Sequence, residues 1–393
     1  MKYRAKLLQL AQAARASYWF LPASMVLFTF VLANLVIWID RSPDMLPFQL
    51  PDRLSNTQIE GARSTLSTIA TSVIGVTGVM FSMTVVAVSF AAGTYGPRLI
   101  GNFMRDRGNQ ISLGILISTF VFSLLVLRVV QSPIEDGEIA AFVPHYSLLL
   151  AIAGSIVAVF AMIYFVHHVP ETINVSNITA NLGHKLERDI RTIIEVNAER
   201  GSSDNATLPD TQPDRQLKLP IAGYIQVLRY SRIKELSEEK ICDVEILCFP
   251  GEFVTRFTPV LNIWQDENLT DEDMSELHEC FAVGTNRTEH QNIYFLVDQL
   301  VEMLARALSP GVNDPFTAIN CLNWMHNALK AAQLHENGMQ NKGVRTSALG
   351  PILTYDKLLE RSFKASKPYC EPDHLVMARY NELMQDLNET SMS

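Results

Sequence analysis

Four long apolar segments constrain the fold more than any other feature of the sequence. A helix that crosses a bilayer needs about 20 mostly apolar residues. Four segments have this character: Tyr18–Ile39, Ser64–Gly93, Ile111–Val130 and His145–His168. None of them contains Asp, Glu or Lys, which argues against a proton relay or an ion-coupled pump. We therefore predict a membrane α-helical fold, with a four-helix transmembrane domain over residues 1–168.

Lysine and arginine beside these segments predict the orientation, because cytoplasmic flanks carry an excess of both. Three flanks that lie on one side are rich in them: Lys2, Arg4, Lys6 and Arg15, then Arg98, Arg105 and Arg107, then Lys185, Arg188 and Arg191. The loop between the third and fourth spans has acidic residues without Lys or Arg. The loop between the first two spans fits less well, since it holds Arg41, Arg53 and Arg63. The balance predicts that both termini are cytoplasmic.

The second span has one small and weakly polar face. Its members recur at steps of three, four or seven residues: Ser64, Thr68, Thr71, Gly75, Gly78, Ser82, Ser89 and Gly93. In lipid, such residues let helices approach closely and hydrogen-bond across the contact, so a packing seam is one interpretation. The other is that the hydroxyls and glycine backbone line a permeation path in an oligomer. On that second interpretation, the seven residues from Ser64 to Ser89 are candidate pore-lining positions.

Arginines near the ends of the spans are candidate pore-mouth residues. Arg98, Arg105 and Arg107 follow the second span, where the positive-inside bias or contact with anionic headgroups explains them equally well. Arg128 lies near the outer end of the third span, where it either snorkels to the surface or selects anions. His167 and His168, at the inner end of the fourth span, are interpreted as interfacial residues rather than as a pH sensor.

Beyond the fourth span the chain has the character of a soluble region. Residues 1–167 hold 11 Lys and Arg against 8 Asp and Glu, which leaves 21 against 33 in the remainder. This acidic balance does not favour nucleic acid as a partner, because phosphate binding needs clustered positive charge. Strand-like and helix-like patterns then predict four parts: a helical extension of the fourth span over 169–198, a flexible linker over 199–216, a small α+β cytoplasmic unit over 217–269 and a helical cytoplasmic region over 270–393.

Two amphipathic helical patterns in that last region are separated by an abrupt break. The second pattern places five residues on one apolar face: Phe316, Ile319, Leu322, Met325 and Leu329. The break contains Ser309, Pro310, Gly311, Asn313, Asp314 and Pro315. Pro310 and Gly311 are expected to end the first helix, while Asp314 is expected to be the N-cap of the second and Pro315 its first residue. The plainer interpretation is a turn that folds two helices back on one another. The alternative is a ligand or anion at the second helix's N-terminus, although Asp314 would compete for the same NH groups.

No motif points to an enzyme. The sequence lacks the signatures of phosphate-binding loops, dinucleotide-binding folds, zinc proteases and serine hydrolases, so we expect no catalytic residue and no cofactor. The cysteines are odd in number and have no metal-ligand spacing: Cys242, Cys248, Cys280, Cys321 and Cys370. Reduced thiols in a cytosolic domain are therefore expected, rather than disulfides or a metal site.

Three parts of the sequence together resemble a known family. They are the DRGNQ segment (Asp106–Gln110), the hydroxyl-rich second span and the SPGVNDP segment (Ser309–Pro315). The family is a bacterial group of predicted membrane proteins classed as domain of unknown function 2254, and the resemblance covers nearly the whole chain. It implies a multi-pass protein of the bacterial inner (plasma) membrane and brings no established activity with it.

Two hypotheses about function follow. The first is a homo-oligomer in the lipid bilayer that forms an ion channel or small-solute pore, with the second span near the pore and the cytoplasmic domain driving assembly or gating. The second is a membrane-anchored sensor or scaffold whose cytoplasmic part binds a partner or ligand of unknown identity. A pore predicts that leucine at Gly78 or Ser82 changes conductance while assembly survives. A packing seam predicts loss of assembly instead.

Overall fold

The computed structural model describes residues 18–42, 57–96, 103, 106–131, 142–200, 209, 211–289, 291–334, 348–349 and 355–390. The chain divides into two compact units, each of which is described by itself. The bundle unit comprises Met1–Gly93 and Pro97–Asn174, and the mixed unit comprises Thr94–Gly96 and Val175–Ser393.

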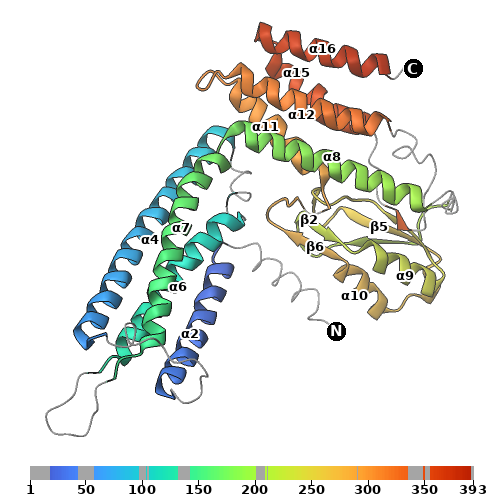
Figure 1. Cartoon of the computed structure of the whole chain (residues 1–393). Helices are drawn as coiled ribbons and strands as arrows, with labels where there is room; N and C mark the ends of the chain where they lie inside the picture. Colours follow the sequence, from blue (N-terminus) through green and yellow to red (C-terminus); the bar gives the residue numbers. More distant parts are fainter. Residues whose placement is uncertain are drawn as a thin grey trace. The chain divides into compact units, whose positions relative to one another are not determined.

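The bundle unit is built from long apolar helices, coloured blue to green in Figure 1: α2 (Phe20–Arg41), α4 (Ile59–Tyr95), α6 (Arg107–Val129) and α7 (His145–Thr172). Each is long and apolar enough to cross a membrane, as the four apolar segments predict. Helices α2, α6 and α7 pack against one another. Helix α4 adds Leu66, Val73 and Met80 to the cores that it shares with α6 and α7.

The mixed unit contains two small sheets around one apolar core. The first has the order β1-β5-β3-β7: β1 (Arg215–Lys218), β5 (Pro259–Trp264), β3 (Asp243–Ile246) and β7 (Ala348–Leu349), with only the β3/β7 pair parallel. The second has the order β4-β2-β6 and is antiparallel: β4 (Phe253–Val254), β2 (Gly223–Leu228) and β6 (Phe281–Gly284). Strand β6 lies beyond residue 269, where the sequence pattern placed the end of the α+β region, because its pairing with β2 is not local.

Short helices accompany these sheets: α9 (Tyr230–Lys240), the 3₁₀ turn η3 (Asp266–Asn268) and α10 (Asp271–Glu279). Helix α10 begins with a capping box, in which the Thr270 hydroxyl accepts from the Asp273 backbone NH and the Asp273 carboxylate accepts from the Thr270 NH. Burial of Ile233, Leu236 and Leu277 joins α9 and α10 to the core of the sheets. Both short helices therefore belong to the same core as the two sheets.

The remaining elements of the mixed unit are helical: α8 (Val175–Arg200), α11 (Ile293–Ala307), α12 (Pro315–Leu334), α14 (Tyr355–Leu359), the π-helical turn η4 (Glu360–Lys364), α15 (Ala365–Cys370) and α16 (His374–Thr390). Helix α8 buries an apolar row against α11 and α12: Ile178, Leu182, Leu186, Ile190 and Ile194. Only Ile173 and Asn174 separate α8 from the end of α7. Half of the linker expected over 199–216 lies outside the described residues, while its ends belong to α8, which runs to Arg200, and to β1, which begins at Arg215.

The break between α11 and α12 is a turn, as the plainer interpretation holds. The two helices pack against each other, and α12 begins at Pro315. Asp314 is the N-cap, since its Oδ1 accepts from the Thr317 NH at 3.1 Å and its Oδ2 from the Thr317 hydroxyl at 2.5 Å. Asn313 has φ +48°, a left-handed conformation that Asn tolerates better than most residues.

Phe316 corrects one expectation about α12. Its sequence pattern places Phe316 on the same apolar face as Met325, yet Phe316 is 72% exposed while Met325 is buried. At 3.6 residues per turn, these two positions are nine residues apart and so point about 180° away from each other. The buried face is instead formed by residues spaced around Met325: Ala318, Cys321, Leu322, Ala328, Leu329 and Ala332.

Candidate functional site

Helix α4 has two opposite faces, and within the described part of the chain one of them is buried and the other exposed. The buried face repeats every three or four residues: Ala62, Leu66, Ala70, Val73, Thr77, Met80, Thr84 and Ala91. Its hydroxyls bond to their own helix, since Thr77 Oγ1 donates to Val73 O at 2.7 Å and Thr84 Oγ1 to Met80 O at 3.0 Å. This face supplies the apolar contacts of α4.

The small face predicted from the sequence lies on the other side of α4. At 100° per residue it is centred about 180° from the buried face. Each of its seven candidate pore-lining residues is exposed: Ser64, Thr68, Thr71, Gly75, Gly78, Ser82 and Ser89. A Cβ added at Gly75, Gly78 or Gly93 would meet no atom within 4 Å. Among the described residues, nothing packs against the small face, so a seam between copies and a pore lining remain the two interpretations.

The candidate pore-mouth arginines do not form one group. Arg98 and Arg105 lie outside the described residues. Arg107 is exposed in the first turn of α6 and Arg128 is exposed in its last turn. At 1.5 Å per residue these two are about 32 Å apart along the helix, so they would stand at opposite ends of any path through the bundle unit.

The DRGNQ segment joins the start of α6 to the end of α7. Asp106 is the N-cap of α6: its Oδ1 accepts from the Asn109 NH at 2.8 Å and lies 2.9 Å from His168 Nε2. Gly108 allows this approach, because a Cβ there would lie 2.5 Å from Tyr164 Oη and 2.7 Å from His168 Nε2. The sequence indicates His168 only as an interfacial residue, because the signal for its partner is no more than an acidic residue just before an apolar span.

A second carboxylate caps a helix at the other end of the same bundle. Asp40, at the end of α2, accepts from the backbone NH of Tyr146 at 2.8 Å and from that of Ser147 at 3.0 Å. The Ser147 hydroxyl also donates to it, at 2.6 Å. A negative charge at a helix N-terminus is stabilised by the unpaired NH groups and the helix dipole. Asp40 and Asp106 thus fix the first turns of α7 and α6, and the sequence analysis assigned neither of them a role.

The helix-break residues use their own polar groups within the turn. Ser309 Oγ donates to Arg306 O at 2.6 Å, and the Asp314 NH donates to Ala307 O at 2.7 Å. The Asp314 carboxylate occupies the N-terminus of α12, where an anion would otherwise bind. The same turn leaves two apolar side chains exposed, Val312 and Phe316. The geometry gives these residues a structural role in the turn.

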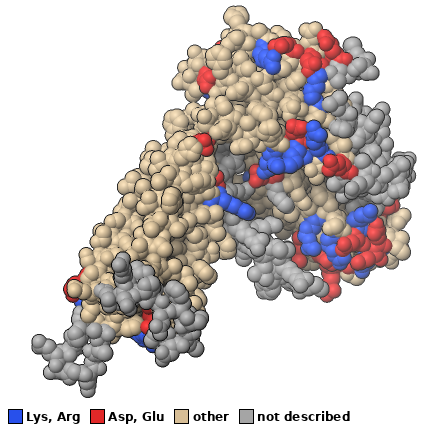
Figure 2. Space-filling model, viewed as in Figure 1, with Lys and Arg blue, Asp and Glu red and all other residues tan. Residues whose placement is uncertain are grey.

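Charged side chains of the mixed unit pair with one another. Figure 2 shows both signs gathered on this unit, while the visible face of the bundle unit is almost free of charge. Asp298 of α11 pairs with two arginines. Its Oδ2 lies 2.5 Å from Arg287 Nη1, and its Oδ1 lies 2.9 Å from Arg361 Nε. Hydrogen bonding to Asp298 raises the pKa of Arg361. Among the described residues, no group of three His, Cys, Asp or Glu side chains is placed to hold a metal ion.

Comparison with known proteins gives a family without an assigned activity. The model of a family described as a predicted membrane protein, domain of unknown function 2254, matches residues 15–386. An uncharacterized protein of Mycobacterium bovis and one of Mycobacterium tuberculosis are each 29% identical over 293 residues, which cover 71% of this chain and 54% of theirs. The chain thus spans about half the length of these relatives. No solved structure matches it.

The family match runs through both units, from before α2 into α16. It includes the DRGNQ and SPGVNDP segments as well as the four helices that are able to cross a membrane. The chain therefore belongs to the family of predicted membrane proteins with domain of unknown function 2254.

Proposed function

We propose that the protein is a homo-oligomer of the bacterial inner membrane in which the small faces of α4 from neighbouring copies surround a path for ions or small solutes. The mixed unit and both termini lie in the cytoplasm in this proposal, where the mixed unit drives assembly or gating. The observation that carries it is the exposure of the whole small face, from Ser64 to Ser89, on the side of α4 that none of the described helices covers.

Bilayer physics supports a partner for this face. In lipid, small and hydroxyl-bearing residues favour close helix contact because they permit dispersion contacts and interhelical hydrogen bonds that acyl chains do not give. From residue 74 to residue 90, the other exposed side chains of α4 are bulky and apolar, including Val79, Phe81 and Phe90, whereas Ser67 and Ser72 are exposed nearer its start. This contrast favours lipid against the bulky side chains, and another copy or water against the small face. Val85 and Val86 interrupt the small face and would narrow a path there.

The two-residue link between α7 and α8 supports a role for the mixed unit in gating. Because Ile173 and Asn174 alone join the two helices, a force on α8 reaches α7 with little slack in the chain. The pairing of α7 with α6 through His168 and Asp106 would carry that force into the bundle unit. No nucleic acid partner and no catalytic step enter the proposal.

Current across planar bilayers tests the path directly. The purified full chain is compared with Gly78→Leu and with Val79→Leu as a matched control, since Val79 is exposed on the bulky face next to Gly78. Unitary currents that change with Gly78→Leu and are unchanged with Val79→Leu are expected. Silent bilayers from correctly assembled protein, over a range of voltages and tensions, would overturn the path. Loss of the oligomer in Gly78→Leu alone would make the small face a seam between copies.

A membrane-anchored sensor or scaffold is the second candidate, favoured by the exposed Val312 and Phe316 on the turn before α12. A photo-crosslinking amino acid at position 316 would trap a partner in cells, whereas the same group at Phe257, which is also exposed, is the control. A discrete adduct at 316 only, with membrane permeability unchanged by Phe316→Ser, is the expected result. Asp314 is unsuitable for this test, because its loss removes the cap of α12.

A further inference from the structure

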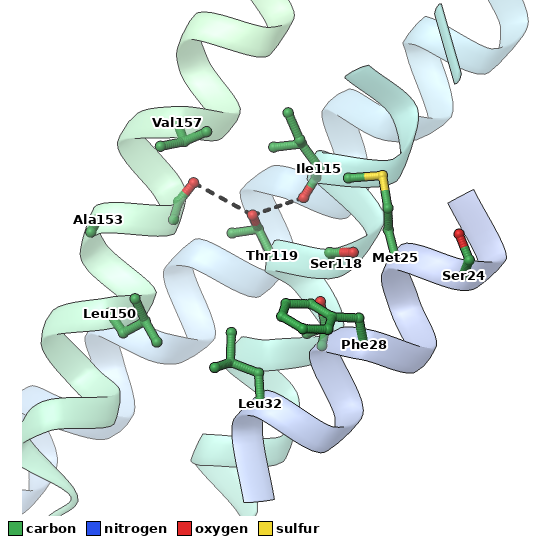
Figure 3. Close-up of a pocket in the computed structure, with 12 residues that line it drawn as sticks. Ser24, Met25, Phe28, Leu32, Ile115, Ser118, Thr119, Leu150, Ala153 and Val157 are labelled. Carbon is green, nitrogen blue, oxygen red and sulfur yellow. Dashed lines mark hydrogen bonds between the residues drawn. The ribbon is translucent and has the colours of Figure 1, made fainter. Parts of the chain in front are cut away.

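A groove of about 620 Å³ opens between α2, α6 and α7 in the bundle unit (Figure 3). Met25 and Phe28 come to it from α2, Ser118 and Thr119 from α6, and Gly154 from α7. The groove is separate from the small face of α4, since α4 contributes no side chain to its lining. The groove and the small face are therefore two separate surfaces of the bundle unit.

The groove lies at the depth of the hydrocarbon. At 1.5 Å per residue, Phe28 is about 12 Å from the start of α2 and Thr119 about 18 Å from the start of α6. Gly154 is about 14 Å from the start of α7. A hydrocarbon core is about 30 Å thick, so these positions fall near the middle of helices able to cross it. Acyl chains are the medium that surrounds the bundle unit at this depth.

Most of the polar atoms in the groove wall are already bonded. Thr119 Oγ1 donates to Ile115 O at 2.8 Å and lies 3.4 Å from Gly154 O, as the dashed lines in Figure 3 show. Ser24 Oγ donates to Leu21 O at 2.7 Å. Ser118 Oγ is buried and has no partner within the described part of the chain. The wall thus offers a mainly apolar surface to an occupant.

This chemistry excludes most other occupants. An ordered water needs two to four polar partners, and one hydroxyl does not supply them. An empty groove of this size forfeits dispersion contacts that packed interiors make. The outer surface of α2 beside the groove is bulky, with Leu27, Phe28 and Leu35 exposed, unlike the small-residue faces through which helices associate in lipid. An apolar chain needs no polar partners and would restore the dispersion contacts that an empty groove lacks.

We propose that this groove is a binding site for one acyl chain of a membrane phospholipid. Gly154 keeps it open, because a Cβ there would sit 3.6 Å from Thr119 Oγ1 and any longer side chain would extend past it.

Position-resolved photolabelling tests the proposal. The full chain is placed in phospholipid nanodiscs that contain a trace of phospholipid with a diazirine in mid-chain, irradiated, and mapped by peptide mass spectrometry. We expect adducts at Met25, Phe28 and Ser118 at least threefold above those at Val79 and Phe90, which are exposed on the bulky surface of α4. Labelling of the groove no greater than that of α4 would overturn the proposal.

Filling the groove gives an independent readout. Gly154→Leu should reduce groove labelling at least threefold and remove the phospholipid that stays bound to the wild-type chain in native mass spectrometry after delipidation. Val159→Leu is the matched control, because Val159 is exposed on α7 outside the groove. Equal lipid retention in both variants would contradict the assignment. If Gly154→Leu does not fold, the labelling pattern of the wild type alone decides.

Discussion

His168 Nε2 lies 2.9 Å from Asp106 Oδ1, so a side chain near the end of α7 is bonded to the residue that caps α6. The imidazole also stacks on Tyr164, with ring centroids 4.9 Å apart. The neighbouring His167 is largely exposed, and its Nε2 lies 3.4 Å from Glu171 Oε1. Two adjacent histidines thus have different surroundings, one half-buried against a carboxylate and the other at the surface.

We predict that His168→Ala destabilises the bundle unit and that His167→Ala does not. Removing His168 breaks a hydrogen bond to a charged group, which costs about 1.5–3 kcal/mol, and also loses the stacking contact with Tyr164. An exposed pair such as that of His167 contributes about 0–1 kcal/mol. Unfolding of the purified chain in mixed micelles, monitored by circular dichroism, measures both. Equal effects of the two variants would contradict a special role for the Asp106 contact.

We predict that Gly183→Ala separates α8 from α12. A Cβ at Gly183 would lie 2.5 Å from Cε3 and 2.7 Å from Cβ of Trp324. Because the Trp324 Cβ is fixed to its backbone, the helices rather than the ring must move, which costs about 1–3 kcal/mol. Gly311→Ala is the control, since a Cβ there meets nothing within 4 Å. Hydrogen exchange at the amides of α8 and α12 should accelerate in the first variant only.

We predict that the native thiols resist maleimide at neutral pH until the mixed unit unfolds. All five cysteines are buried. Burial raises the pKa of Cys248 to about 12 and those of Cys280 and Cys370 to about 11, and it also raises that of Cys321. The thiolate is the reactive form, so little of it exists at pH 7. Intact-mass analysis before and after denaturation measures labelling, and rapid reaction of the folded chain would be the contrary result.

We predict that acid weakens the contact between α12 and α16 through His326. Its Nε2 lies 2.7 Å from Asp386 Oδ2. Burial lowers the pKa of His326 below its ordinary 6.5, against the opposing effect of Asp386, and the nearby Lys330 and Arg379 lower it further.

Folding lowers the pKa of this histidine, so its contribution to stability is fully present above the ordinary pKa of 6.5. That contribution is lost as the pH falls from there toward the lower pKa of the folded state. Thermal unfolding of the full chain should therefore shift downward between pH 7.5 and 5.5, and less so in His326→Gln. The opposite sign would arise if the Asp386 contact outweighed burial.

The sequence predicted the elements whose signal is local. Hydropathy is enough to locate the four long helices, and Asp314 with Pro315 is enough to place the start of α12, because a cap and a first-turn proline act over a few residues. The small face of α4 was also visible as a spacing, yet its exposure depends on which side Leu66 and Met80 bury, which periodicity alone does not decide.

Other features come from contacts between distant segments. Residue 106 and residue 168 belong to different spans, and no local pattern pairs Asp106 with His168. The groove forms where α2, α6 and α7 meet beside Gly154, so no single segment of the sequence predicts it. Phe316 is apolar, like Met325, yet it is exposed. Its angular position on α12, and not its residue type, decides which side of the helix it occupies. Strand β6 was missed since its partner, β2, lies more than 50 residues earlier.

The length of α4 has a consequence for where its small face begins. Its 37 residues extend about 55 Å, and even at a tilt of 40°, the upper end of the usual range, they would cover about 42 Å along the bilayer normal against roughly 30 Å of hydrocarbon. At least two turns must therefore stand outside the hydrocarbon. Glu60 and Arg63 mark the first turns as the polar ones, so Ser64, one residue beyond this pair, belongs near the boundary of the hydrocarbon rather than at its centre.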